Sequence, residues 1–134
     1  MTPLITLKEH WISRKAVTSS NATEIYKQFP PHIIPKLEDI SEGRISEMDK
    51  GNVTLQVLSH GPLESSSSVY ILVNDELAKA ISKNPTHLAG FAMLSMGDPE
   101  AAATELERCV KGHGFLRALI DNHLDKEFYG DGKF

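Results

Sequence analysis

Short apolar segments alternate with segments of helical periodicity along most of this chain. Runs of aliphatic and β-branched residues predict four strands, at residues 4–10, 53–59, 88–94 and 115–120. Apolar positions that recur every three or four residues predict three intervening helices, at residues 37–48, 69–81 and 98–112. The third helix has the clearest start, because Asp98 is a good N-cap and Pro99 suits the first helical position.

Two segments lie outside this alternation. Residues 13–35 contain serine, asparagine and proline signals with one possible helical turn at 24–28, and they predict a long surface loop. Residues 125–134 contain Gly130 and Gly132 and are expected to be irregular.

The order β-α-β-α-β-α-β predicts an α/β fold with a parallel sheet, because crossover connections between such strands are right-handed and return each strand parallel to the last. Polar residues gather just after the carboxyl ends of the strands, at residues 8–10, 59–60, 95 and 121–123. Because α/β folds place their binding chemistry at this edge, we expect the site there.

Charge and composition exclude several kinds of partner. The net charge is −4, and no run of Lys or Arg exceeds two residues, so we expect neither nucleic acid nor a membrane surface as a partner. No stretch approaches the roughly 20 apolar residues of a membrane helix. The single cysteine, Cys109, suits a reducing compartment and is expected to be a core residue, so a cytoplasmic protein is predicted.

Three blocks of the sequence carry a resemblance to a known family. They are LKEHW at residues 7–11, the segment 44–59 that ends in QVLS, and the segment 74–115 with NDELA, GFA, DPE and RCV. These blocks are similar to the decarboxylase branch of the amidohydrolase superfamily, which includes hydroxybenzoate and aminocarboxymuconate-semialdehyde decarboxylases.

The resemblance implies a (β/α)8 TIM barrel, and the length implies that only part of one is present. A complete barrel needs about 250 residues, so we expect residues 1–134 to be a partial amidohydrolase-related domain with about half of the barrel's parallel β/α units. A truncated gene product, a gene-model fragment and a diverged protein without catalysis are all compatible with this expectation.

The resemblance also implies a divalent metal, zinc, manganese or magnesium, held partly by the first strand. The family places an acidic residue at the position of Lys8 and a histidine at the position of His10. Strand alternation puts these two side chains on one face and Leu7 and Glu9 on the other. His10 is thus the candidate metal ligand, but an ammonium beside the ion would weaken binding by several kcal/mol. Glu9 would replace the missing carboxylate only if a bulge turned it inward.

Four further residues are candidates for binding substrate, and no catalytic residue is assigned. The four are Trp11, His60, Asp121 and His123. Each has a plainer interpretation: packing for Trp11, a turn residue for His60 and a solvated loop residue for His123. Asp121 stands where relatives usually have an asparagine that contacts the substrate carboxylate.

Two functions follow from these observations. The first is that of a metal-dependent decarboxylase of small hydroxylated aromatic acids, with the 134-residue chain inactive by itself. The alternative is a non-catalytic half-barrel that self-associates as a homo-oligomer or docks on a full-length relative, because half a barrel leaves open strand edges and an apolar face.

Overall fold

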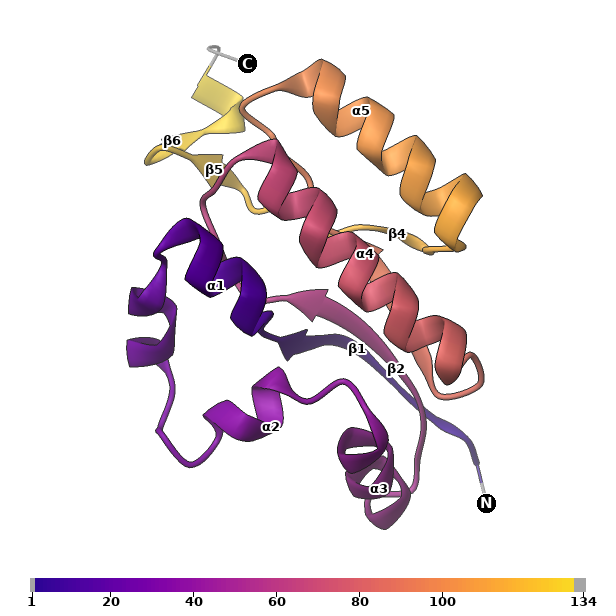
Figure 1. Cartoon of the computed structure of the whole chain (residues 1–134). Helices are drawn as coiled ribbons and strands as arrows, with labels where there is room; N and C mark the ends of the chain where they lie inside the picture. Colours follow the sequence, from indigo (N-terminus) through magenta and orange to yellow (C-terminus); the bar gives the residue numbers. More distant parts are fainter. Residues whose placement is uncertain (1, 132–134) are drawn as a thin grey trace.

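A computed structural model describes residues 2–131 and contains a four-stranded parallel sheet (Figure 1). The strand order is β1-β2-β3-β4, and each strand pairs in parallel with the next. The strands are β1 (Leu4–Trp11), β2 (Val53–His60), β3 (Leu88–Ala92) and β4 (Arg117–Ala118). The predicted parallel α/β sheet is confirmed, although β4 is shorter than the segment 115–120 predicts.

Three helices follow the strands as the periodicity predicts. They are α3 (Glu42–Lys50), α4 (Ser67–Lys83) and α5 (Pro99–Glu107), the last extended by a π-helical turn, η2 (Arg108–Gly112). Asp98 caps α5, because its Oδ1 accepts a hydrogen bond from the Ala101 amide at 3.0 Å. The helix α3 begins later than predicted, because Oδ1 of Asp39 accepts from the Ser41 amide and forms a turn just before it.

The expectation of a long loop at residues 13–35 is wrong. This segment folds into α1 (Arg14–Ser20), the 3-10 helix η1 (Thr23–Gln28) and the start of α2 (Ile34–Glu38). Ser13 caps α1, and a small apolar cluster of Ile12, Val17 and Ile25 holds the segment against the sheet. The polar and proline residues therefore act as helix caps and first-turn residues here.

The tail is also more regular than expected within the described residues. Strands β5 (His123–Leu124) and β6 (Glu127–Phe128) form an antiparallel hairpin, and η3 (Tyr129–Asp131) follows it. Residues 132–134 of the predicted irregular tail lie outside the described residues.

One face of the sheet carries the core, and the opposite face is open. Figure 1 shows α4 and α5 side by side across the strands. Gly90 of β3 lies under α4, where a Cβ atom would meet Leu77 Cδ2 at 2.9 Å. The outer strand β1 leaves Leu7 exposed, with a relative solvent accessibility of 65%.

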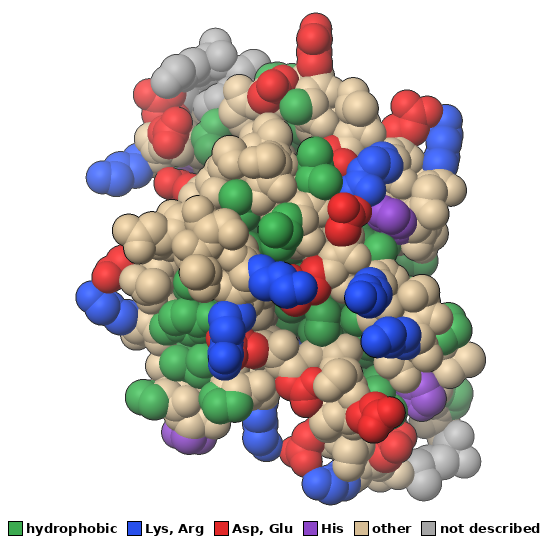
Figure 2. All heavy atoms as spheres, in the orientation of Figure 1, with side chains coloured by type: hydrophobic (Ala, Val, Ile, Leu, Met, Phe, Trp, Pro, Cys, Tyr) green, Lys and Arg blue, Asp and Glu red, His purple; other side chains and the backbone are tan. Residues whose placement is uncertain are grey.

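The surface has no concentration of one charge on the face that Figure 2 shows, where acidic and basic side chains are interspersed. Within residues 2–131, no helix is both long and apolar enough to cross a bilayer.

Candidate functional site

A small cavity lies at the carboxyl ends of the parallel strands. Its volume is about 70 Å³. The polar side chains that line it are Lys8, His10, Ser59, His60 and Asp121, which β1, β2 and the segment after β4 contribute. The structure thus brings three predicted site residues, His10, His60 and Asp121, to one cavity.

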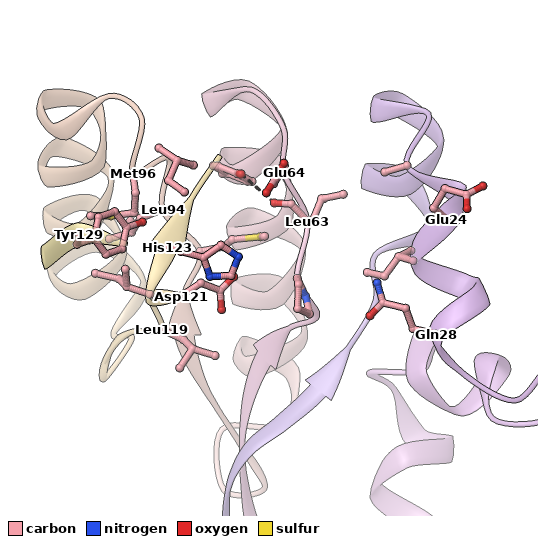
Figure 3. A pocket seen from close by; sticks show the side chains of 17 residues that line it. Glu24, Gln28, Leu63, Glu64, Leu94, Met96, Leu119, Asp121, His123 and Tyr129 are labelled. Carbon is pink, nitrogen blue, oxygen red and sulfur yellow. Dashed lines mark hydrogen bonds between the residues drawn. The ribbon is translucent and has the colours of Figure 1, made fainter. Parts of the chain in front are cut away.

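A larger cavity of about 510 Å³ adjoins the small one (Figure 3). The two share four wall residues: Pro62, Met93, Leu119 and Asp121. Figure 3 shows Asp121 and His123 near each other inside it, with Glu24 and Gln28 across the opening. Both predicted substrate residues of the 121–123 segment therefore line a cavity.

The strand β1 contains a bulge that simple alternation does not predict. Leu7 pairs with Val57 and Glu9 with the next residue, Leu58, so Lys8 is the extra residue, and its φ is +59°. The prediction that Leu7 and Glu9 share a face is wrong, because the bulge reverses the alternation.

The bulge does not bring Glu9 into the site. Glu9 stands opposite Leu58, whose side chain belongs to the core beneath the helices. Its charge acts instead on Arg44, whose pKa is lowered by burial while the Glu9 carboxylate opposes that shift. Lys8 and His10 do line the same cavity, as predicted.

His60 serves as a structural link at the end of β2. Its Nε2 accepts a hydrogen bond from the Ser13 amide at 2.9 Å, so Nδ1 carries the proton and donates to the Gly61 carbonyl at 2.6 Å. The pKa of His60 is lowered to about 4, mainly by burial; the hydrogen bond to the Gly61 carbonyl opposes this shift, and the nearby His10 adds to it. Both ring nitrogens are therefore hydrogen-bonded within the protein, and neither is free to bind a ligand.

Trp11 does not form the floor of a pocket. Its side chain is fully buried in the core cluster and packs edge-on against His60, with ring centroids 5.3 Å apart. The register explains this position, because Trp11 pairs with His60 at the end of the β1–β2 ladder, where α1 and α4 cover it. Trp11 thus packs in the core, and its substrate-binding role stays a prediction.

The exposed side chain of His123 interacts with its own hairpin. Its Nδ1 lies 2.8 Å from Asn122 Oδ1, and its ring lies 6.0 Å from that of Phe128. Asp121 is also exposed. Burial is the main cause that raises the pKa of Tyr129, and the charge of Asp121 raises it as well. Asp121 thus places a negative charge at the boundary between the two cavities.

Sequence reasoning missed two contributors to the site. Ser59 lines the small cavity, although it is only 1% exposed. Asn74 of α4 fixes the end of β3, because its Nδ2 donates to the Met93 carbonyl at 2.9 Å and its Oδ1 accepts from the Met93 amide at 2.8 Å. The sequence did signal Ser59, through the polar pair 59–60 at the end of a predicted strand. Nothing in the helical period of α4 distinguishes Asn74 from a solvated residue.

The described residues do not by themselves suit a divalent cation. Residues 2–131 contain no group of three or more His, Cys, Asp or Glu side chains placed to hold a metal. Catalytic zinc sites use about three protein ligands. In the small cavity both ring nitrogens of His60 are already hydrogen-bonded, and the ammonium of Lys8 accompanies His10. The charge of Lys8 opposes a cation there.

Known decarboxylases are similar in sequence to this chain. No protein-family model matches the chain. The decarboxylase orsB of Emericella nidulans is 40% identical over 134 residues, covering 96% of this chain and 40% of that protein. A gamma-resorcylate decarboxylase from Polaromonas sp. is 35% identical over 125 residues, covering 87% of this chain and 38% of that protein.

A solved structure of a decarboxylase also matches this chain. A dihydroxybenzoic acid decarboxylase from Polaromonas sp., crystallised with manganese and the inhibitor 2-nitroresorcinol, matches with a TM-score of 0.77 at 33% identity. The match covers 91% of this chain and 39% of that chain.

The fold and the comparisons show that the four parallel strands and their helices match part of a TIM barrel. More narrowly, the chain is a homologue of the aromatic acid decarboxylases of the amidohydrolase superfamily, which confirms the resemblance. The chain spans about 40% of the length of these relatives, in agreement with the expected partial barrel.

Proposed function

We propose that this chain forms the β1–β4 part of a barrel enzyme that decarboxylates a small hydroxylated aromatic acid. The observation that carries the proposal is the pair of adjoining cavities at the strand ends, in a chain that matches a dihydroxybenzoic acid decarboxylase over 91% of its length. The larger cavity has the space and the apolar wall residues for an aromatic ring, and the small one has polar side chains for its carboxylate.

The 134 residues alone are expected to bind such an acid without releasing carbon dioxide. The described residues offer no group of three metal-ligand side chains, so the divalent ion of a complete site would need further ligands from another part of the protein or another chain. Manganese is the first ion to test, because the Polaromonas structure contains it, with zinc and magnesium as the other two.

The test is to incubate the purified chain with 2,6-dihydroxybenzoate and each ion, and to measure ligand binding by calorimetry and carbon dioxide release separately. Binding without release supports the proposal. Absence of binding with every ion and without any ion would contradict it. Glucose, which has no carboxylate or aromatic ring, is a suitable control ligand.

We also propose that the chain self-associates. Large apolar side chains are exposed on the edge strand β1 and beside the edge strand β4: Leu4, Ile5, Leu7, Leu116 and Ile120. Open strand edges with apolar neighbours favour pairing with a second copy. Light scattering that gives the mass of a monomer at micromolar concentration would contradict this proposal.

The cytoplasm is the proposed location, because Cys109 is buried and unpaired. Cell fractionation with an antibody against the chain tests it, and recovery in a secreted fraction would contradict it.

A further inference from the structure

The hydroxyl of Ser59 is an unpartnered polar group in the wall of the small cavity. Its Oγ is buried and has no hydrogen-bond partner among residues 2–131. A buried hydroxyl without a partner destabilises the folded protein. A ligand that offers an oxygen or a proton in this cavity would remove that destabilisation.

Lys8 is an exposed residue that lines the same cavity and also the neighbouring groove beside Glu9 and Arg44. The bulge in β1 holds Lys8 at φ +59°, outside the regular strand ladder. Its ammonium forms no ion pair with any residue from 2 to 131, in contrast to Lys36 and Lys50, which both pair with Glu47. The polar groups of the cavity are therefore one cation, one hydroxyl, the rings of His10 and His60, and the Asp121 carboxylate at its boundary with the larger cavity.

The two cavities differ in size, and each matches a different part of an aromatic acid. A water molecule occupies about 30 Å³, so 70 Å³ accommodates a carboxylate group but no benzene ring. The adjoining cavity of 510 Å³ has apolar walls that include Leu63, Leu94 and Met96. A ring in this space would lie next to Asp121, at the boundary of the two cavities.

We propose that the small cavity binds the carboxylate of an aromatic acid through Lys8 Nζ and Ser59 Oγ, without a divalent cation. This inference rests on the proposed function and deepens it, because the ammonium takes over the attraction that a metal ion would otherwise provide. Asp121 accepts a hydrogen bond from a ring hydroxyl next to the carboxylate, which favours hydroxylated acids over benzoate.

The experiment is a calorimetric titration of the chain with 2,6-dihydroxybenzoate in the presence of EDTA, and again with manganese in place of EDTA. We expect binding in EDTA, a loss of affinity of at least tenfold in Lys8→Gln, and a loss of about threefold to tenfold in Ser59→Ala. Lys8→Arg retains the charge and should stay within about threefold of the parent. Benzoate should bind more weakly than 2,6-dihydroxybenzoate, and this difference should disappear in Asp121→Ala, which has no side-chain acceptor.

Lys83→Gln is the matched control, because Lys83 is exposed at the end of α4 and its loss changes the net charge by the same amount. Unchanged affinity in Lys8→Gln, or equal losses in Lys8→Gln and Lys83→Gln, would overturn the inference. Binding that requires manganese would overturn it while leaving the proposed function intact. Absence of binding in both conditions would refute the proposed function itself. Circular dichroism of each variant confirms that the fold is retained.

Discussion

Acidification is expected to destabilise the protein through His60. The ring is 7% exposed and accepts the Ser13 amide at Nε2, so protonation at that nitrogen both removes a hydrogen bond and buries a charge. Burial is the main reason that the pKa of His60 falls from 6.5 to about 4 in the folded protein.

The sign and size of the effect follow from these two values. Between pH 6.5 and about pH 4 the unfolded chain binds the proton and the folded protein does not. The stabilising contribution is therefore complete above pH 6.5 and is lost as the pH falls through this window. At about pH 5 the loss relative to pH 7 is about 2 kcal/mol, on the scale of 1.36 kcal/mol per pKa unit.

Urea unfolding of the parent chain and of His60→Gln, at intervals from pH 7 to pH 4, measures this contribution. The free energy of unfolding of the parent should decline more steeply than that of His60→Gln, with a difference in decline of about 2 kcal/mol by pH 5. The exposed His32 provides the control His32→Gln, which should follow the parent profile. Parallel profiles for the parent and His60→Gln would refute the reasoning.

Three further outcomes are expected. Asn74→Ala should lower the free energy of unfolding by about 3 kcal/mol, because it leaves both the amide and the carbonyl of Met93 without their partner; a loss below about 1 kcal/mol in urea unfolding would contradict this. Gly90→Ala should cost about 1–3 kcal/mol, because its Cβ would lie 2.9 Å from Leu77 Cδ2, and an unchanged melting temperature would contradict it. Cys109 should react with a thiol reagent only after denaturation, because it is fully buried and burial raises its pKa to about 12; rapid labelling of the folded protein would show otherwise.

The alternation of strands and helices was predictable because burial imposes its period on the sequence. The apolar run at 88–94 predicts a strand covered on both faces. Leu88 and Ala92 are buried, whereas Ala89 and Phe91 on the other face are half-buried. The cap at Asp98 was predictable for a local reason, since the hydrogen bond to the Ala101 amide needs only residues close in sequence.

The helices at residues 13–38 were not predictable in this way. Their order depends on contacts between distant residues, such as the Tyr26 hydroxyl donating to Glu38 Oε1 at 2.6 Å and the packing of Ile12 with Ile25. Local signals such as the prolines mark where such short helices start and stop, but they do not show that the chain between them is helical.

Part of the site was predictable, and the bulge at Lys8 explains why the other part was not. Alternation assigns side chains to faces by counting, so one extra residue reverses the assignment of every position before it. Ile5 and Leu7 consequently lie on the same open face as His10, opposite the core-facing Glu9. This face carries the exposed Ile5 and Leu7 at one end and the small cavity at the other. Such an apolar face is more stable when other protein segments cover it. The same backbone irregularity that gives Lys8 access to the cavity therefore also gives β1 the apolar surface that a barrel interior requires.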